Sequence, residues 1–393
     1  MTLEEALRLA LTHHPSLKAA AARMAAAAGR AEQAGRWSNP ELEIRTEEWA
    51  VSRGRGFADA EQTVGIAQTL PYPGKKSLDK QLGGVAVQLA EVEQRLRRTE
   101  IVREVKAAFY RVLVMERVVE VSTQRVALAE SFALTARRRV EAGAATAQEQ
   151  LRAEVQLEQA RTESDEWLRE KEISRQSLAL MLGQPELKDA ALIGALAEAP
   201  PPRWPEAETE AWLERHPSVM AAQAALVQAR LAHRRARLET YPDLKVSLAG
   251  GRRGETDEGI IALGFSLPLP LLDRGQGRQR ESLAQVHQAE AELHLVQQQL
   301  RQEWIRARKR YQTAAIQVGR YREQLLPKAE EALHLVQQGF EEGKFTFMDL
   351  LDTQRTAAET RLAYWQKVLE LHLAQAELEA LLRPETPGLT SPH

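Results

Sequence analysis

The chain has 393 residues, with 53 Lys and Arg against 55 Asp and Glu, so its formal net charge is −2. Aromatic residues make up only 5% of it and charged residues 27%, which is typical of long helices and coiled coils rather than of several compact cores. The sequence contains no cysteine, which excludes disulfides, thiolate zinc sites and a cysteine nucleophile. The near-neutral charge argues against nucleic-acid binding.

The amino-terminal residues show neither a targeting segment nor a membrane-spanning helix. No apolar run reaches the ~18–20 residues that such a helix needs. Residues Met1–Glu5 are acidic and lack the apolar stretch of a signal peptide. Composition alone therefore predicts a soluble, helical, cytoplasmic protein, an expectation that the strand pattern below overturns.

Short helices come first along the chain. Residues 3–13 predict an amphipathic helix that ends at His14-Pro15, because a residue before proline disfavours the α conformation. An alanine-rich helix follows from about Ser16 to Gly35, and a similar helix runs over about 217–240 in the second half of the chain.

Strands follow each of these helices. Four segments alternate apolar residues with polar or small ones, which predicts strands with one apolar and one polar face. Glycine- and arginine-rich stretches (52–56 and 250–254) join them pairwise as hairpins. Aromatic residues that would suit a membrane interface lie at the strand ends, at Trp37, Trp49 and Tyr241. The strands are expected at about residues 41–49, 62–70, 243–251 and 259–267.

Very long helices follow the strands. Roughly 65 residues between Pro73 and Gly143 would span ~100 Å as one helix. Glycines at 143 and 343 are expected to end the long helices, and return helices follow near 148–182 and 348–382. Pro327 is expected to kink the second long helix. Apolar or small residues recur every three or four positions along both helices, at Val105, Ala108, Val112, Met115, Val119, Ser122, Val126, Ala129, Ala133, Ala136 and Val140 in the first and at Leu300, Trp304, Ala307, Tyr311, Ala314, Val318, Tyr321 and Leu325 in the second.

The chain is a tandem repeat of one unit of about 200 residues. His14-Pro15-Ser16-Leu17 recurs as His216-Pro217-Ser218-Val219, and Glu141-Ala142-Gly143 recurs as Glu341-Glu342-Gly343. These landmarks keep the same order and spacing in both halves. The sequence therefore divides into a first repeat (1–185), a proline-rich linker (186–208), a second repeat (209–383) and a short tail (384–393).

Neither the hairpins nor the long helices can bury their apolar surfaces within one chain, since open strand edges need partners. A trimer would close a twelve-stranded β-barrel, four strands from each chain, above a twelve-helix α-barrel. A single hairpin of this kind more often lies half-buried in a soluble core, but two at matched positions favour a membrane barrel. The side chains then expected to face lipid are Val64, Ile66, Val246, Leu248, Ile261, Leu263 and Phe265.

Several motifs in this order resemble the TolC-like outer membrane factors of tripartite efflux and secretion systems. They are Leu3-Glu4-Glu5-Ala6-Leu7, the strand exits Leu70-Pro71-Tyr72-Pro73 and Leu267-Pro268-Leu269-Pro270, and the turn at 339–352. The resemblance covers almost the whole chain. It implies a homotrimeric conduit with an outer-membrane barrel and a periplasmic helical tunnel. The tip of such a tunnel docks onto a membrane-fusion adaptor, which connects it to an inner-membrane pump of RND or ABC type.

Asp349 and Asp352 lie on one face of the helix after the second turn. The family places constriction aspartates at these positions, which implies two stacked carboxylate rings in the trimer. Such rings attract cations and raise each other's pKa. The alternative is that these acidic residues only complement the helix dipole at the start of the helix.

The two turns are the expected adaptor-docking tips, with Gly143 and Thr146 in the first and Gly343 and Thr346 in the second. Their alternative role as plain helix caps is compatible with docking. Family members also lock a closed tip through hydrogen bonds of Tyr and Arg near this turn. The corresponding positions here are Phe340 and Phe345, so a lock in this chain must use other contacts.

No catalytic motif or phosphate-binding loop occurs, so we do not expect an enzyme or a bound cofactor. The nine histidines are scattered without the spacing of a metal site. The predicted function is a passive exit duct. Its location in the outer membrane is inferred from the strands, although no signal peptide is visible. The alternative is a soluble coiled-coil scaffold or assembly protein, which would need no detergent for extraction.

Overall fold

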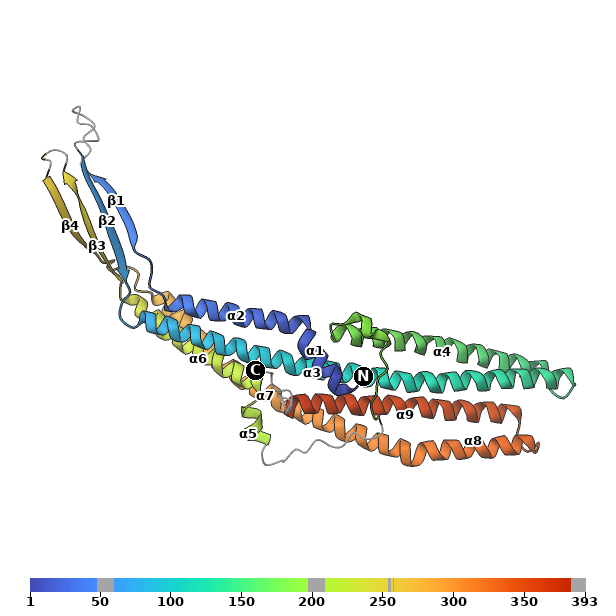
Figure 1. The fold of residues 1–393 in the computed structure, drawn as a ribbon. Helices are drawn as coiled ribbons and strands as arrows, with labels where there is room; N and C mark the ends of the chain where they lie inside the picture. Colours follow the sequence, from blue (N-terminus) through green and yellow to red (C-terminus); the bar gives the residue numbers. More distant parts are fainter. Residues whose placement is uncertain (48–59, 197–208, 254–255, 257, 383–393) are drawn as a thin grey trace. The chain divides into compact units, whose positions relative to one another are not determined.

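A computed structural model describes residues 1–47, 60–196, 209–253, 256 and 258–382 (Figure 1). The predicted tail, Trp49, the hairpin stretch 52–56 and linker residues 197–208 lie outside the described residues. Two compact units divide the chain, and each contains segments of both repeats. The helical unit comprises Met1–Ala20, Gln94–Pro217 and Gln298–His393, and the sheet unit comprises Ala21–Glu93 and Ser218–Gln297.

The helices follow the order that the sequence predicts. The longest, α3, has 67 residues and is therefore about 100 Å long. Within the described residues, no helix combines the length and the apolar character needed to cross a membrane. The α-helices are α1 Leu3–His13, α2 Pro15–Gly35, α3 Lys75–Glu141, α4 Ala147–Met181, α5 Thr209–Glu214, α6 Pro217–Arg237, α7 Gln276–Arg320, α8 Leu326–Glu341 and α9 Phe347–Leu382.

The four strands form one antiparallel sheet in the order β1-β2-β3-β4 (Figure 1). Ile66 in β2 lies opposite Leu42 in β1 and Leu248 in β3, and Leu248 in turn lies opposite Leu263 in β4. The prediction of a mainly helical chain with four strands is therefore confirmed. The strands are β1 Glu41–Glu47, β2 Glu61–Leu70, β3 Leu244–Arg253 and β4 Glu258–Ser266.

Glycine ends both helices that lead into the tip turns. Gly143 has φ 70° after α3 and Gly343 has φ 72° after α8, the left-handed conformation that lacks a steric penalty only for glycine. The next helix starts at a threonine in each case, so both turns pair a glycine stop with a threonine cap. The predicted left-handed caps are confirmed.

The second long helix is irregular directly before Pro327, where a kink is predicted. A π-helical turn, Tyr321–Leu325, separates α7 from α8, and the Leu326 N–H donates to the Tyr321 carbonyl. Proline lacks an N–H and its ring clashes with the carbonyl four residues earlier. The wider π turn removes the regular i−4 geometry at this point, which accommodates the proline near the start of α8.

The core of the helical unit follows the predicted helical spacing. The seam positions from Val105 to Val119 in α3 and from Leu300 to Val318 in α7 are buried within one chain, which corrects the expectation that the long helices could not bury their apolar surface, whereas Leu325 at the end of the second series is 45% exposed. One cluster joins Val118 of α3, Trp304 of α7 and Leu378 of α9, and another packs the short helix α1, through Leu7, against Val105 of α3. Full burial of such side chains contributes about 1.5–3 kcal/mol each, so α1 is anchored by packing despite its length.

Candidate functional site

The sheet has one predominantly apolar face. The strand register places all seven side chains predicted to contact lipid on this face, and in the single chain they include some of the most exposed apolar groups, with Ile261 85% and Phe265 67% exposed. Leu42 and Ile44 of β1, 70% and 73% exposed, share the face. The predicted set omitted them, although their alternation with Glu43 and Arg45 carried the same signal.

The opposite face of the sheet is polar and lined by small residues. A Cβ on Gly65 would come 2.5 Å from Ala249 Cβ, and a Cβ on Gly264 would come 2.5 Å from Ser247 Oγ. Because the β2 residues on this face, such as Gly65 and Ala67, have small side chains or none, Lys245 of β3 reaches across β2 to β1. Its Nζ lies 2.7 Å from Glu41 Oε2 and 2.8 Å from Glu43 Oε1. The sheet therefore separates apolar from charged surface, as a membrane barrel around water requires.

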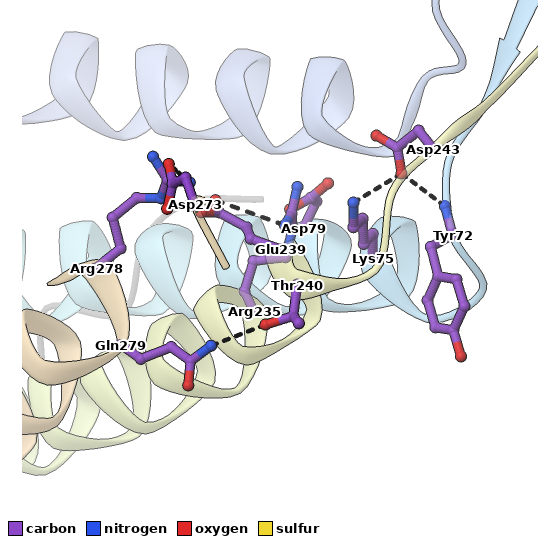
Figure 2. Close-up of polar contacts among 10 residues, drawn as sticks. All are labelled: Tyr72, Lys75, Asp79, Arg235, Glu239, Thr240, Asp243, Asp273, Arg278 and Gln279. Atoms are coloured by element: carbon purple, nitrogen blue, oxygen red, sulfur yellow. Dashed lines mark hydrogen bonds and ion pairs between the residues drawn. The ribbon is translucent and has the colours of Figure 1, made fainter. Parts of the chain in front are cut away.

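A network of ion pairs holds the helices together where they meet the strands (Figure 2). Lys75 at the start of α3 is buried, and its Nζ lies 2.7 Å from Asp243 Oδ1, which also accepts a hydrogen bond from the Tyr72 N–H at 2.8 Å. The Arg235 guanidinium of α6 donates to Asp79 Oδ1 of α3 at 2.8 Å. Both pairs join the first repeat to the second, so this network fixes how the two repeats meet below the sheet.

Two aromatic rings mark the same level of the molecule. Tyr72 follows β2, Tyr241 precedes β3, and their rings stack with centroids 4.6 Å apart. Aromatic side chains of this kind are enriched at membrane interfaces. The sequence pattern predicts this role for Tyr241 but not for its partner Tyr72, since their stacking depends on the pairing of the two repeats.

At the second tip, Asp349 takes part in a reciprocal helix cap. Its carboxylate accepts hydrogen bonds from the Thr346 N–H at 2.8 Å and the Thr346 hydroxyl at 2.6 Å, while the Asp349 N–H donates to Thr346 Oγ1 at 3.2 Å. These hydrogen bonds from Thr346 lower the pKa of Asp349. Within one chain the carboxylate is thus stabilised as an anion, opposite to the rise in pKa that neighbouring carboxylates of a ring would cause.

Asp352 lies one turn further along α9. Its carboxylate is 2.9 Å from Arg355 Nη2 and its side chain is 68% exposed. The matching positions of the first tip carry Glu149 and Arg152, so the second tip has the larger surplus of carboxylates. The paired rings of Asp349 and Asp352 stay a prediction, because they require neighbouring chains.

The two tip turns share one geometry. Thr146 accepts a hydrogen bond from the Glu149 N–H at 3.3 Å, as Thr346 does from Asp349. The second tip differs in its aromatic residues. The Phe345 ring occupies the place that a Cβ on Gly339 would take, yet this ring stays 43% exposed.

Phe340 connects the two helical hairpins of the helical unit. Arg139 Cζ of α3 lies 5.4 Å from the centre of the Phe340 ring, a cation–π contact. Phe340 also packs against Phe347, 5.9 Å between centroids, beside a buried cluster that includes Ala136 of α3. Within the chain Phe340 thus contacts Arg139, and a lock of the closed tip through contacts other than those of Tyr and Arg stays a prediction.

The described residues contain no group of three or more His, Asp or Glu side chains placed to hold a metal ion. His372 illustrates the packing role of the buried histidines. Its ring stacks on Tyr110 with centroids 4.0 Å apart, and its Nε2 lies 3.2 Å from the Leu196 carbonyl oxygen.

Comparison with known proteins places this architecture in a family. The family model of outer membrane efflux proteins matches residues 6–184 and 209–382. The cobalt-zinc-cadmium resistance protein CzcC of Cupriavidus metallidurans is 28% identical over 385 residues, which cover 97% of this chain and 90% of that protein.

Solved structures share the fold. The outer membrane protein VceC from Vibrio cholerae matches with a TM-score of 0.80 at 20% identity, covering 97% of this chain and 95% of its own. The outer-membrane channel OprN matches with a TM-score of 0.83 at 19% identity, covering 97% and 89%. These matches do not support the alternative of a soluble scaffold. The chain therefore belongs to the outer membrane efflux protein family, whose members are channels rather than enzymes, and it is an exit duct of the outer membrane that extends into the periplasm.

Proposed function

We propose that the chain works as a homotrimer, in which three copies of the sheet close a barrel and the helices of three chains close a tunnel. The segregation of the sheet into one apolar and one charged face carries this proposal. A four-stranded sheet with Leu42 and Ile261 exposed on its two outer strands leaves both edges open, and only further strands can pair them.

The surface of α4 supports the same assembly. Four large apolar side chains that fall on one face of the helix are more than half exposed in the single chain, an arrangement that favours packing against a neighbouring chain. They are Leu151 at 61%, Val155 at 56%, Ile173 at 59% and Leu180 at 64%.

We infer that divalent metal cations are the cargo, and that an inner-membrane pump of RND or ABC type delivers them through a membrane-fusion adaptor. The name of the relative CzcC, a cobalt-zinc-cadmium resistance protein, supports this cargo. The surplus of carboxylates at the second tip, Asp349 and Asp352, would attract cations to the narrow end of the tunnel. Conduction is passive, so the duct needs neither a catalytic group nor a tight metal site.

The adaptor is proposed to bind the two tip turns, at Gly143 and Thr146 and at Gly343 and Thr346. The exposed ring of Phe345 offers an apolar contact there. Phe340 is half-buried against Arg139 and is the weaker candidate for contact with a partner.

Ion selectivity in a planar bilayer tests both the channel and its constriction. The trimer with Asp349→Asn and Asp352→Asn in each chain should lose most of the cation preference of the wild type. The matched control removes the same charge from an exposed part of α4, with Glu166→Gln and Glu170→Gln, and should keep the preference. Unchanged selectivity in the aspartate variant would refute the proposed role of Asp349 and Asp352 in the constriction. A wild type that conducts no ions would refute the proposal that the trimer is a duct.

A further inference from the structure

A polar hollow lies directly below the strands in the sheet unit. It has a volume of about 620 Å³, opens to the surface and is bordered by the first turns of α3, the end of α6 and the start of α7. This volume is in the range of small-ligand pockets. Its walls present Arg234 and Arg237 from α6, Ser77 and Gln81 from α3, and Gln279 from α7.

The hollow carries uncompensated positive charge. None of the described residues that line it has a carboxylate. Arg234 and Arg237 are exposed, and within the described part of the chain neither forms an ion pair. Two arginines three residues apart on a helix present their guanidinium groups from the same face.

Three carboxylates of the junction between the helices and the strands already have cationic partners (Figure 2). Asp79 pairs with Arg235, and Asp243 pairs with Lys75. Glu239 accepts from Arg278 at 2.6 Å. The surplus charge in the hollow is therefore not neutralised by these carboxylates, and an anion from outside the chain can bind there.

The position of the hollow identifies the source of that anion. Tyr241 lines the hollow and stacks on Tyr72, and the apolar face of the sheet ends just above at Leu70 and Leu244. If the apolar face lies in the bilayer, this level coincides with the headgroups of the periplasmic leaflet. Guanidinium groups bind phosphate oxygens through two parallel hydrogen bonds, and the serine and glutamine side chains supply further polar groups.

We propose that this hollow binds the phosphodiester headgroup of a phospholipid from the periplasmic leaflet of the outer membrane, held by Arg234 and Arg237. The inference rests on the proposed function, because it requires the sheet to lie in a bilayer. It adds a specific lipid site at the base of the barrel, where a bound headgroup would set the depth of the chain in the membrane.

Native mass spectrometry of the purified full-length trimer, with dioleoylphosphatidylglycerol as the probe, tests the site. The wild type should retain tightly bound lipid, and Arg234→Gln with Arg237→Gln should bind it about tenfold more weakly or worse, since two charge-assisted contacts are lost. The control is Arg23→Gln with Arg30→Gln on α2, which removes the same charge from exposed positions of the same unit and should bind as the wild type does.

Three results would overturn the proposal: a wild type that retains no lipid, equal lipid affinity in the wild type and the Arg234→Gln/Arg237→Gln variant, or displacement of the lipid by an equal concentration of inorganic phosphate. The last result would assign the hollow to free phosphate. Should the glutamine variant fail to assemble, Arg234→Lys with Arg237→Lys keeps the charge without the planar fork and should still show weaker binding. Bilayer conductance of the wild type separates the two proposals, because a conducting trimer without bound lipid refutes only the lipid site.

Discussion

A single charge on the apolar face of the sheet should be far more costly in a bilayer than the same charge on the polar face. Leu263 and Ala262 are neighbours in β4, both are exposed in the single chain, and they point to opposite faces. We expect Leu263→Arg to impair folding into lipid and Ala262→Arg to be tolerated, because the second side chain would point into the water-filled lumen.

The structure sets the size of the effect. The nine residues of β4 extend ~30 Å at about 3.4 Å each, and a tilt of about 40° reduces their height to ~23 Å, near the ~25 Å apolar band of a membrane barrel. Leu263 is the sixth of these residues, so it lies within a few Å of the midplane. An arginine there costs about 2–4 kcal/mol per chain, a roughly 30-fold to 700-fold change in the folding equilibrium.

Urea titration of folding into phosphatidylcholine vesicles measures this difference. The wild type and Ala262→Arg should have similar midpoints, and Leu263→Arg should unfold at clearly lower urea. Equal destabilisation by the two arginines would refute the orientation of the sheet, because only a bilayer makes the two faces unequal.

Three further predictions concern the helices and their junctions. Lys75→Met leaves the Asp243 carboxylate without its buried cation and should lower the free energy of unfolding by about 1–3 kcal/mol. Adding Asp243→Asn should restore part of this loss. If thermal denaturation shows no recovery in the double variant, the two residues do not stabilise the fold as a pair. Phe340→Ala removes the ring beneath Arg139 and should cost about 2–4 kcal/mol, seen as faster proteolysis of the tips, whereas unchanged proteolysis would mean that this contact does not hold the hairpins together. Burial lowers the pKa of His216 to about 4 from an ordinary 6.5. As the pH falls, the histidine therefore takes up its proton in the unfolded chain before it does so in the folded chain. The contribution of His216 to the free energy of unfolding is fully present above pH 6.5 and falls by up to about 3 kcal/mol towards pH 4. His216→Phe should flatten that part of the pH profile, and an unaltered profile would assign the loss to other groups.

Local signals predicted most of the elements. Alternation located all four strands, because each strand has one apolar and one polar face. Gly143 and Gly343 located the tips, because the left-handed conformation that ends each helix favours glycine over every other residue. The spacing of Val105 and Val112 located the core of α3, since a helix repeats every 3.6 residues.

Contacts between the repeats could not be predicted in this way. Lys75 and Asp243 are 168 residues apart, and no local pattern shows that the exit of β2 meets the start of β3. The contact of Arg139 with Phe340 has the same origin, because it depends on how two helical hairpins pack. The π turn before Pro327 was missed for another reason: proline signals a disturbed helix but does not specify which irregular turn absorbs it.

The mass of the particle purified from outer membranes tests the central claim most directly. Sedimentation in detergent should give three chains of 44.0 kDa each, and removal of the detergent should cause aggregation, since the apolar face of the sheet then contacts water. A stable monomer that sediments as a single chain without detergent or lipid would contradict the account.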